Sequence, residues 1–265
     1  MASMPQGIGS TVLYEKRDDH VAVVTLNRPE ARNAINGEVA EAIDHIVAQT
    51  EADPEVRVVI ITSSHEKVFC AGADLAEISR GNASRLRTEN GGFAGFAKAK
   101  RTKPWIAAVR GAAFAGGCEI ALACDMIVAA DDARFGLPEV KRGLYAGAGG
   151  PFRLASVLPR NIAIELVVTG DPLDAARAYA LGMVNRLVSA DELLPAALEL
   201  AAAIAVNAPM SVRESLGVVR QAQDLDEVSF WPLSESVQQR VFASDDAREG
   251  PLAFLEKRAP RWTGR

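Results

Sequence analysis

The sequence predicts an α/β fold in which strands alternate with helices, followed by a C-terminal part that is helical. β-branched runs at 20–26 (HVAVVTL) and 56–62 (VRVVIIT) are typical of strands. Beyond Gly150 this alternation gives way to a helical pattern. The chain has 265 residues, 49% of them hydrophobic, which is enough for a large core with an appendage.

The first half of the chain supplies the alternating elements. Turn-rich residues follow the first strand at 27–36, and residues 68–75 (VFCAGADL) predict a tight glycine loop after the second strand. The polar, glycine-punctuated residues 76–100 predict a helix and a mobile connection. Between the first two strands a helix is expected from Asn36 to Glu51, because apolar residues recur there at helical spacing, at Val39, Ile43, Ile46 and Val47.

Two further strands are expected at 104–109 (PWIAAV) and 125–130 (DMIVAA), with a helix that begins near Gly117 between them. The remainder is expected to be helical, and its apolar faces predict a subunit interface. Proline and glycine residues should break these helices. The breaks are expected at Pro159, Gly170–Pro172, Gly182, Pro209, Pro232 and Gly250–Pro251.

Composition argues against several classes of protein. A net charge of −5 argues against a general nucleic-acid binder. No run of uncharged apolar residues is long enough for a membrane span, and the opening MASMPQGIGS lacks the apolar core of a signal peptide. We therefore expect a cytoplasmic protein whose three cysteines are buried thiols (Cys70, Cys118 and Cys124). The histidines are scattered and predict no metal site: His20, His45 and His65.

Two glycine loops are candidates for binding an anion or a developing oxyanion. AGG at 115–117 lies between a predicted strand and a predicted helix, where backbone N–H groups have no partner inside the helix. CAGAD at 70–74 follows another strand and offers a second set of N–H groups. Two N–H groups from two loops could hold one carbonyl oxygen. The alternative is that both loops are only tight strand-to-helix turns.

Two glutamates are candidates for acid–base chemistry. Glu119 sits in an otherwise apolar segment, where burial raises a carboxyl pKa and a helix start lowers it. Glu139 follows Pro138 in a turn (FGLPEV). Carboxyls that converge on one water form a general acid–base pair, but a spacing of twenty residues does not show convergence. Alternatively, Glu119 complements the helix dipole and Glu139 is an exposed loop acid.

A third glycine loop, LYAGAGGPFRL at 144–154, contains G-x-G and raises the possibility of a dinucleotide site. No strand precedes it, and Phe152 occupies the place of the third glycine. A helix-entry loop is the better interpretation, and a nicotinamide oxidoreductase is the weaker alternative.

Taken together, these motifs resemble the crotonase, or enoyl-CoA hydratase, superfamily. The resemblance spans Tyr14 to Arg258 in the expected order, which is far more specific than any one glycine loop. The matching stretches are LNRPEARNAIN (26–36), FCAGADL (69–75), KPWIAAVRGAAFAGGCEIALACD (103–125), ARFGLPEVKRGL (133–144), AGAGGPFRL (146–154), LGMVNRLV (181–188) and GPLAFLEKR (250–258).

The resemblance implies a spiral of ββα units over residues 1–200 and a helical region over 201–265 that builds a homotrimer or a hexamer. It implies acyl thioesters of coenzyme A as substrates, with no further cofactor and no metal. The family's two oxyanion-hole N–H groups fall on Ala73 and Gly116. Its two hydratase glutamates fall on Glu119 and Glu139, with Glu119 as the base toward water and Glu139 as the proton donor to C2.

The sequence departs from the family pattern at three places. Glu30 stands where a basic residue often lies near the coenzyme's phosphates, so Arg28 or Arg32 would have to substitute. Ala115 replaces the first glycine of GGGCE, and Ala146 replaces a proline, which could alter the acyl pocket. The resemblance assigns substrate and coenzyme contacts to Arg28, Arg32, Ala71, Asp74, Leu75 and Gly147, to Phe254 near the adenine, and to Lys257, which would reach a neighbouring subunit's coenzyme.

The leading hypothesis is therefore an enoyl-CoA hydratase, in fatty-acid or related acyl-CoA catabolism. Within the superfamily, the alternatives are a Δ3,Δ2-enoyl-CoA isomerase, an acyl-CoA hydrolase and a hydratase-lyase for aromatic acyl-CoA. A different class is a non-catalytic acyl-CoA-binding protein, but retention of both glutamates argues against it.

Overall fold

The computed structural model describes residues 10–222 and 224–265. Within them the main sheet has six strands, of which β1 is antiparallel to β2 and the rest are parallel. β2, β3 and β7 are apolar and buried on both faces, as parallel strands between helical layers require. In sheet order the strands are β1 (Val12–Lys16), β2 (Val21–Leu26), β3 (Val58–Ser63), β7 (Trp105–Val109), β9 (Met126–Ala130) and β12 (Arg186–Val188).

A second, smaller sheet continues the chain after each central strand of the first. β3 leads into β4, β7 into β8 and β9 into β10, and after each pair the chain turns into a helix. The ββα spiral that the resemblance implied is therefore confirmed. The second sheet, in order, is β11 (Leu173–Asp174), β10 (Arg134–Gly136), β8 (Ala112–Phe114) and β4 (Val68–Cys70), and a separate hairpin is formed by β5 (Arg87–Thr88) and β6 (Gly92–Phe93).

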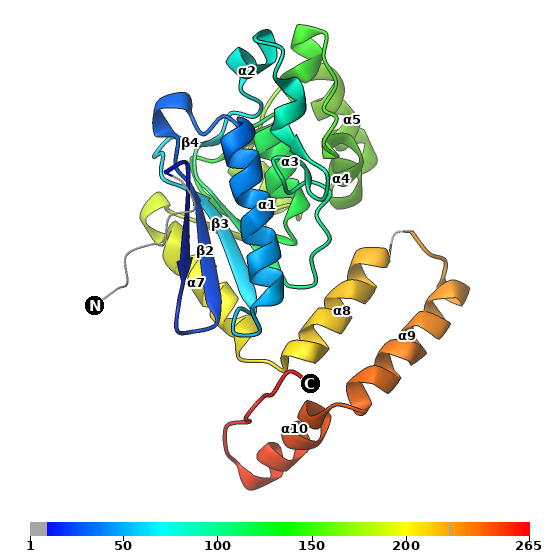
Figure 1. Cartoon of the computed structure of the whole chain (residues 1–265). Coiled ribbons are helices and arrows are strands. Elements are labelled where there is room, and N and C mark those ends of the chain that lie inside the picture. The colour runs from blue at the N-terminus through cyan, green and yellow to red at the C-terminus, as the bar shows by residue number, and fades with distance from the viewer. Residues whose placement is uncertain (1–9, 223) are drawn as a thin grey trace.

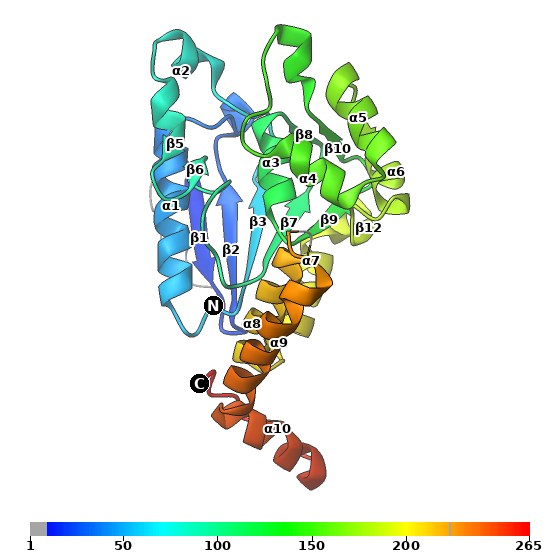
Figure 2. The ribbon, with the colours of Figure 1, turned by 90° about the vertical axis from the view of Figure 1, so that its right-hand side faces the viewer.

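Helices cover both faces of the main sheet (Figures 1 and 2). α1 (Gly37–Ala52) starts where the Asn36 side chain accepts a hydrogen bond from Val39 N, and it buries its apolar stripe against one face. All residues of α3 (Gly116–Ala123) are buried. The opposite face packs on α7 (Leu193–Ala205), which forms a second apolar core with β2, β3, β7 and β9.

The remaining helices connect the spiral and complete the C-terminal part. The short elements are η1 (Pro29–Ala31), α2 (Leu75–Ser79), η2 (Ala83–Leu86), η3 (Pro138–Arg142), α4 (Gly150–Val157), α5 (Arg160–Thr169), α6 (Ala175–Ala180) and η4 (Ala190–Glu192). Three longer helices project away from the core (Figure 1): α8 (Pro209–Gln221), α9 (Glu227–Phe242) and α10 (Asp245–Glu256).

The projecting helices keep much of their apolar surface exposed. α9 buries no residue within the single chain, and α10 buries only Asp246 and Ala253. α8 is fastened to the core by Arg220, whose guanidinium pairs with both carboxylate oxygens of Asp125 at 2.7 and 2.8 Å. The exposed apolar side chains of these helices include Val219, Val228, Trp231, Phe242, Leu252, Phe254 and Leu255.

No single helix in the described ranges has the length and apolarity to cross a membrane. The bent pair Ala190–Ala205 and Pro209–Gln221, at 107° to each other, passes that test only jointly, by length and composition. Residues 1–9, where no signal peptide is expected, lie outside the described residues.

Several expectations about individual elements need correction. β1, β11 and β12 were not expected, and residues 68–70 form a strand before the glycine loop. Residues 76–100 contain only the short α2, a 3-10 turn and the β5–β6 hairpin. The breaks at Pro159, Gly170, Gly182 and Pro209 are confirmed as helix boundaries. Those at Pro232 and Pro251 are wrong, because α9 and α10 run through them.

Candidate active site

The two glycine loops predicted to bind an oxyanion are pressed against each other. Gly72 has φ +96°, and a Cβ atom there would lie 3.0 Å from Gly116 N and 2.9 Å from Ala115 Cβ. A Cβ atom at Gly117 would come within 2.1 Å of the Cys70 carbonyl oxygen. Only glycine permits this approach at both positions, so the sequence itself brings the ends of β4 and β8 together.

Each loop contributes one backbone N–H that is available to a ligand. Ala71 N donates to Arg32 O and Asp74 N to Ile35 O, whereas Ala73 N has no hydrogen-bond partner in the part of the chain that the structure describes. Gly116 is the first residue of α3, so its N–H has no acceptor within the helix. Two adjoining loops therefore each carry an N–H without a partner among the described residues, at the two positions that the resemblance assigns to the oxyanion hole.

Glu119 lies one turn into α3 with only 3% of its surface exposed. Its Oε1 accepts hydrogen bonds from Ala148 N at 2.7 Å and Gly150 N at 2.9 Å. Burial raises the pKa of this carboxyl, while the two N–H groups and the charges of Arg153 and Arg87 oppose that rise. Glu119 is thus buried, fixed in position and provided with groups that stabilise its ionised form.

Glu139 lies in η3, directly after Pro138, and is partly buried. Its Oε2 is buried and has no hydrogen-bond partner within the described residues. Burial raises the pKa of the Glu139 carboxyl, its own backbone N–H lowers it, and the negative charge of Glu119 raises it further. Leu137, the residue before η3, and the Cγ atom of Glu119 both lie against Gly150, so the structure brings η3 beside Glu119, which the spacing in the sequence did not show.

Arg153 is a residue of this site that the sequence analysis missed. Its guanidinium donates to Ala148 O at 2.8 Å and to Ala97 O at 2.6 Å. The Ala148 peptide is thereby held on both sides, by Glu119 at its nitrogen and by Arg153 at its oxygen. An arginine in the first turn of an otherwise apolar helix, just after a glycine loop, was the signal available in the sequence.

The residues assigned to coenzyme binding fall into two groups. The guanidinium of Arg28 is already bound within the chain, because it donates to Asp74 at 3.2 Å and to Ala34 O at 2.6 Å. Asp74 in turn caps α2 through Ala76 N. Arg32, by contrast, is exposed and could contact the coenzyme. Three other residues assigned to substrate or coenzyme binding are exposed as well: Ala71, Leu75 and Gly147.

Phe254 and Lys257 are not brought to this site by the single chain. Phe254 is 82% exposed on α10, and Lys257 ends that helix in a left-handed conformation with φ +54°. α10 lies at the far end of the projecting helices from the α3 region (Figure 1).

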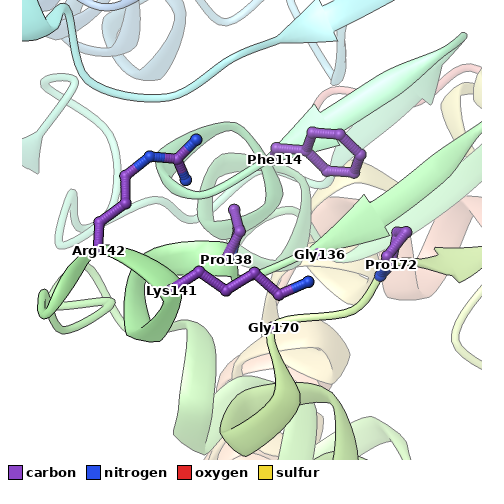
Figure 3. A pocket seen from close by; sticks show the side chains of 7 residues that line it. All are labelled: Phe114, Gly136, Pro138, Lys141, Arg142, Gly170 and Pro172. Atoms are coloured by element: carbon purple, nitrogen blue, oxygen red, sulfur yellow. The ribbon is translucent and has the colours of Figure 1, made fainter.

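A hollow of about 390 Å³ lies at the ends of β8 and β10, where Phe114, Gly136 and Pro138, the residue before Glu139, line it. Figure 3 shows Lys141 and Arg142 on one side of it and Phe114 on the other. Lys141 is paired with Asp171 at 2.5 Å, whereas Arg142 lowers the pKa of Glu139 by its charge. No group of His, Cys, Asp and Glu side chains in the described ranges could hold a metal ion.

Comparison with known proteins agrees with this arrangement. The model of the enoyl-CoA hydratase/isomerase family matches residues 16–265. Carnitinyl-CoA dehydratase of Proteus mirabilis is 42% identical over 250 residues, covering 92% of this chain and 95% of that protein. The Escherichia coli O157:H7 protein of the same name is 41% identical over 261 residues, covering 97% and 100%.

Solved structures show the same relationship. Enoyl-CoA hydratase from Mycobacterium tuberculosis H37Rv superposes with a TM-score of 0.93 at 43% identity, over 97% of this chain and 100% of that one. Carnitinyl-CoA hydratase from Mycobacterium avium has a TM-score of 0.74 at 44% identity, with the same coverage. With its ββα spiral, its paired glycine loops and its two glutamates, the chain belongs to the enoyl-CoA hydratase/isomerase family of the crotonase superfamily and is a hydratase-like enzyme.

Proposed function

We propose that this enzyme adds water across the C2–C3 double bond of a 2-enoyl-CoA to give a 3-hydroxyacyl-CoA. The observation that carries the proposal is the placement of two carboxyls: Glu119 is buried, and both it and Leu137, the residue before η3, lie against Gly150, while Glu139 in η3 is partly buried and its pKa is raised by the Glu119 charge. Hydration needs one group that takes a proton from water and another that gives a proton to carbon. No cofactor is needed besides the coenzyme A of the substrate.

The thioester oxygen would be held by Ala73 N and Gly116 N. As water adds at C3, negative charge develops on that oxygen, and two fixed N–H donors stabilise it more than they stabilise the ground state. The loops need not move to receive this charge, because Gly72 and Gly117 already hold them in contact.

The two carboxyls differ in a way that supports separate roles. Glu119 accepts two backbone hydrogen bonds and lies near two arginines, all of which favour its ionised form as the base toward water. Glu139 has an unpartnered oxygen and is affected by the Glu119 charge, which favours its protonated form as the donor to C2. Because the charge of Glu119 acts on Glu139, we assign the acid and base roles to the two carboxyls together, with this division as the proposed one.

Two alternative reactions deserve a direct comparison. An isomerase would depend chiefly on Glu139, so the presence of a second carboxyl, that of the buried Glu119, favours hydration. Dehydration of a carnitinyl-CoA is a second candidate within the same chemistry, because the relatives with 41–42% identity carry that name. An acyl-CoA hydrolase or an aromatic hydratase-lyase finds no specific support in the geometry.

We further propose that residues 201–265 form an oligomerisation region and that the enzyme is a homotrimer or a hexamer. The exposed apolar side chains of α8–α10 support this, because a single chain leaves them in water. Lys257 and Phe254 would then contact coenzyme A bound to a neighbouring subunit.

The test is hydration of crotonyl-CoA by Glu119→Gln, by Glu139→Gln and by the double variant. Each single variant should lose on the order of a hundred- to ten-thousand-fold in kcat. If both residues act on one water, the double variant should be little worse than the poorer single one. Glu66→Gln is the control, since Glu66 is an exposed glutamate in the turn between β3 and β4.

Binding of 3-hydroxybutyryl-CoA, the product of crotonyl-CoA hydration, should survive in both single variants, because glutamine can still accept hydrogen bonds. A Glu139→Gln enzyme with normal activity would refute the paired mechanism even if Glu119 proved essential. Turnover of a 3-enoyl-CoA faster than hydration would identify an isomerase instead.

A further inference from the structure

The β5–β6 hairpin lies against the reacting end of the site. Phe93 is only 6% exposed, and its ring is so close to Gly116 that a Cβ there would lie 2.4 Å from two ring carbons. Arg87 is the cross-strand partner of Phe93. The hairpin is held by Thr88 Oγ1, which donates to Asp44 Oδ1 at 2.7 Å, so the backbone that carries Arg87 is fixed.

The guanidinium of Arg87 lies beside the loop that holds Glu119. Its Nη2 is 3.8 Å from the point that a Cβ atom of Gly147 would occupy, and the next N–H along the chain, that of Ala148, donates to Glu119. The Arg87 charge lowers the pKa of Glu119, whereas the pKa of Glu139 is lowered by the charge of Arg142. Arg87 is therefore on the Glu119 side of the pair.

Arg87 makes no direct polar contact with the described residues. It is exposed, and within the described residues it forms neither an ion pair nor a hydrogen bond. The neighbouring Arg85 points elsewhere, toward Glu41 at 3.8 Å and the start of α1. A guanidinium with free donors at the edge of a binding site is suited to a carboxylate or another acceptor.

A coenzyme phosphate is the other anion that an arginine could bind. The whole pantetheine arm separates the phosphates from the thioester, however. If the thioester oxygen sits at Ala73 and Gly116, the phosphates lie well away from Glu119, and what lies near Glu119 is the reacting double bond and the acyl carbons beyond it. The group that Arg87 can reach is therefore a substituent of the acyl chain.

We propose that Arg87 determines specificity at the acyl end, so that the enzyme prefers 2-enoyl-CoA substrates with a carboxylate beyond C3 over those with a fixed cation there. The inference rests on the proposed function. A positive charge on the substrate would meet Arg87 without compensation, whereas a carboxylate would pair with it. This enzyme would then differ in substrate from relatives whose names specify carnitinyl-CoA.

The experiment compares three 2-enoyl-CoA substrates of similar shape. They carry at C4 a carboxylate (4-carboxybut-2-enoyl-CoA), a trimethylammonium group (4-trimethylammoniobut-2-enoyl-CoA) or the neutral tert-butyl isostere of the latter (5,5-dimethylhex-2-enoyl-CoA). The readout is the ratio of kcat/KM values for wild type, Arg87→Met, Arg87→Glu and Arg87→Lys, with Arg85→Met as the matched control.

Wild type should favour the carboxylate over the cation by at least about tenfold, which corresponds to about 1.4 kcal/mol at 25 °C. Arg87→Met should bring the ratio close to unity, Arg87→Glu should invert it, and Arg87→Lys should restore part of it. Arg85→Met should keep the wild-type ratio. A ratio that is the same in wild type and Arg87→Met overturns the assignment.

The outcome also separates this inference from the proposed function. If wild type does not hydrate crotonyl-CoA, the proposed function fails and the Arg87 assignment fails with it. If wild type hydrates crotonyl-CoA but prefers the trimethylammonium substrate to its neutral isostere, only the Arg87 assignment fails.

Discussion

Replacing Gly72 by alanine should separate the two glycine loops and impair catalysis more than stability. The new Cβ atom would lie 2.9 Å from Ala115 Cβ, 3.0 Å from Gly116 N and 3.1 Å from Phe114 O. Ordinary van der Waals contacts are several tenths of an ångström longer, and the neighbours are two backbone atoms and a Cβ atom fixed to the backbone, which yield only if the loop moves. Gly116 N is one of the two proposed oxyanion donors, so its displacement acts directly on the transition state.

The expected magnitude has two parts. An alanine at the φ of +96° found for Gly72 should cost about 1–3 kcal/mol of stability. A donor displaced by part of an ångström should lower kcat by between about tenfold and a hundredfold. Hydration of crotonyl-CoA measures kcat, and thermal unfolding measures the loss of stability.

Gly182 provides the matched control. It has a similar φ of +86°, but a Cβ atom there would meet no heavy atom within 4 Å. Gly182→Ala should therefore lose similar stability and keep its activity. If both alanine variants hydrate crotonyl-CoA at the wild-type rate, the proposed oxyanion role of the contact between the loops is refuted.

Three other predictions concern the glutamates, Ala115 and the projecting helices. Burial raises the pKa of Glu119 in the folded state, so ionisation of this carboxyl should destabilise the fold as pH rises above 4.5. In urea unfolding, Glu119→Gln should therefore gain more stability over wild type at pH 7 than at pH 4. Ala115 has φ +50°, so Ala115→Gly should raise stability by about 1 kcal/mol, and an unchanged melting temperature would argue against strain there. Light scattering should show a trimer or hexamer that Phe242→Glu weakens, and an active wild-type monomer at micromolar concentration would contradict the proposed assembly.

The activity should also depend on pH in a way that follows from the two carboxyls. The proposed mechanism needs Glu119 ionised and Glu139 protonated, so kcat/KM should fall on both sides of an optimum. Burial raises the pKa of both groups above the ordinary 4.5, and the mutual repulsion raises that of Glu139 further. The fall of kcat/KM on the acid side should therefore lie above pH 4.5. The dissociation constant of 3-hydroxybutyryl-CoA should show no such fall in affinity.

The sequence predicted the core elements well because their signals are local. The β-branched runs at 20–26 and 56–62 became β2 and β3, and the helix from Asn36 begins with the cap that its side chain provides. The prolines of α9 and α10 were misinterpreted for a local reason as well. Pro232 and Pro251 are exposed, so the carbonyl that each leaves without a donor can reach water, and the helix continues.

The site depended on information that is not local. No spacing rule brings Glu139 to Glu119, because their approach is made by the second sheet and by η3. Arg87 and Arg153 carry no motif of their own, and their importance comes from what they meet: one lies beside Gly147, and the other holds Ala148 O. The glycines of the two loops were the exception, because a residue without a Cβ atom already indicates close approach.

The Arg153 clamp makes the position of Glu119, the proposed base, depend on residues 76–100. Arg153 joins Ala97, at the end of that segment, to the peptide whose N–H holds Glu119. Exchanging residues 76–100 should therefore also move the carboxyl that is proposed to take the proton from water. Substrate specificity and catalytic rate are therefore linked in this fold. A redesign of either should keep Arg153 and its two acceptors, Ala148 O and Ala97 O.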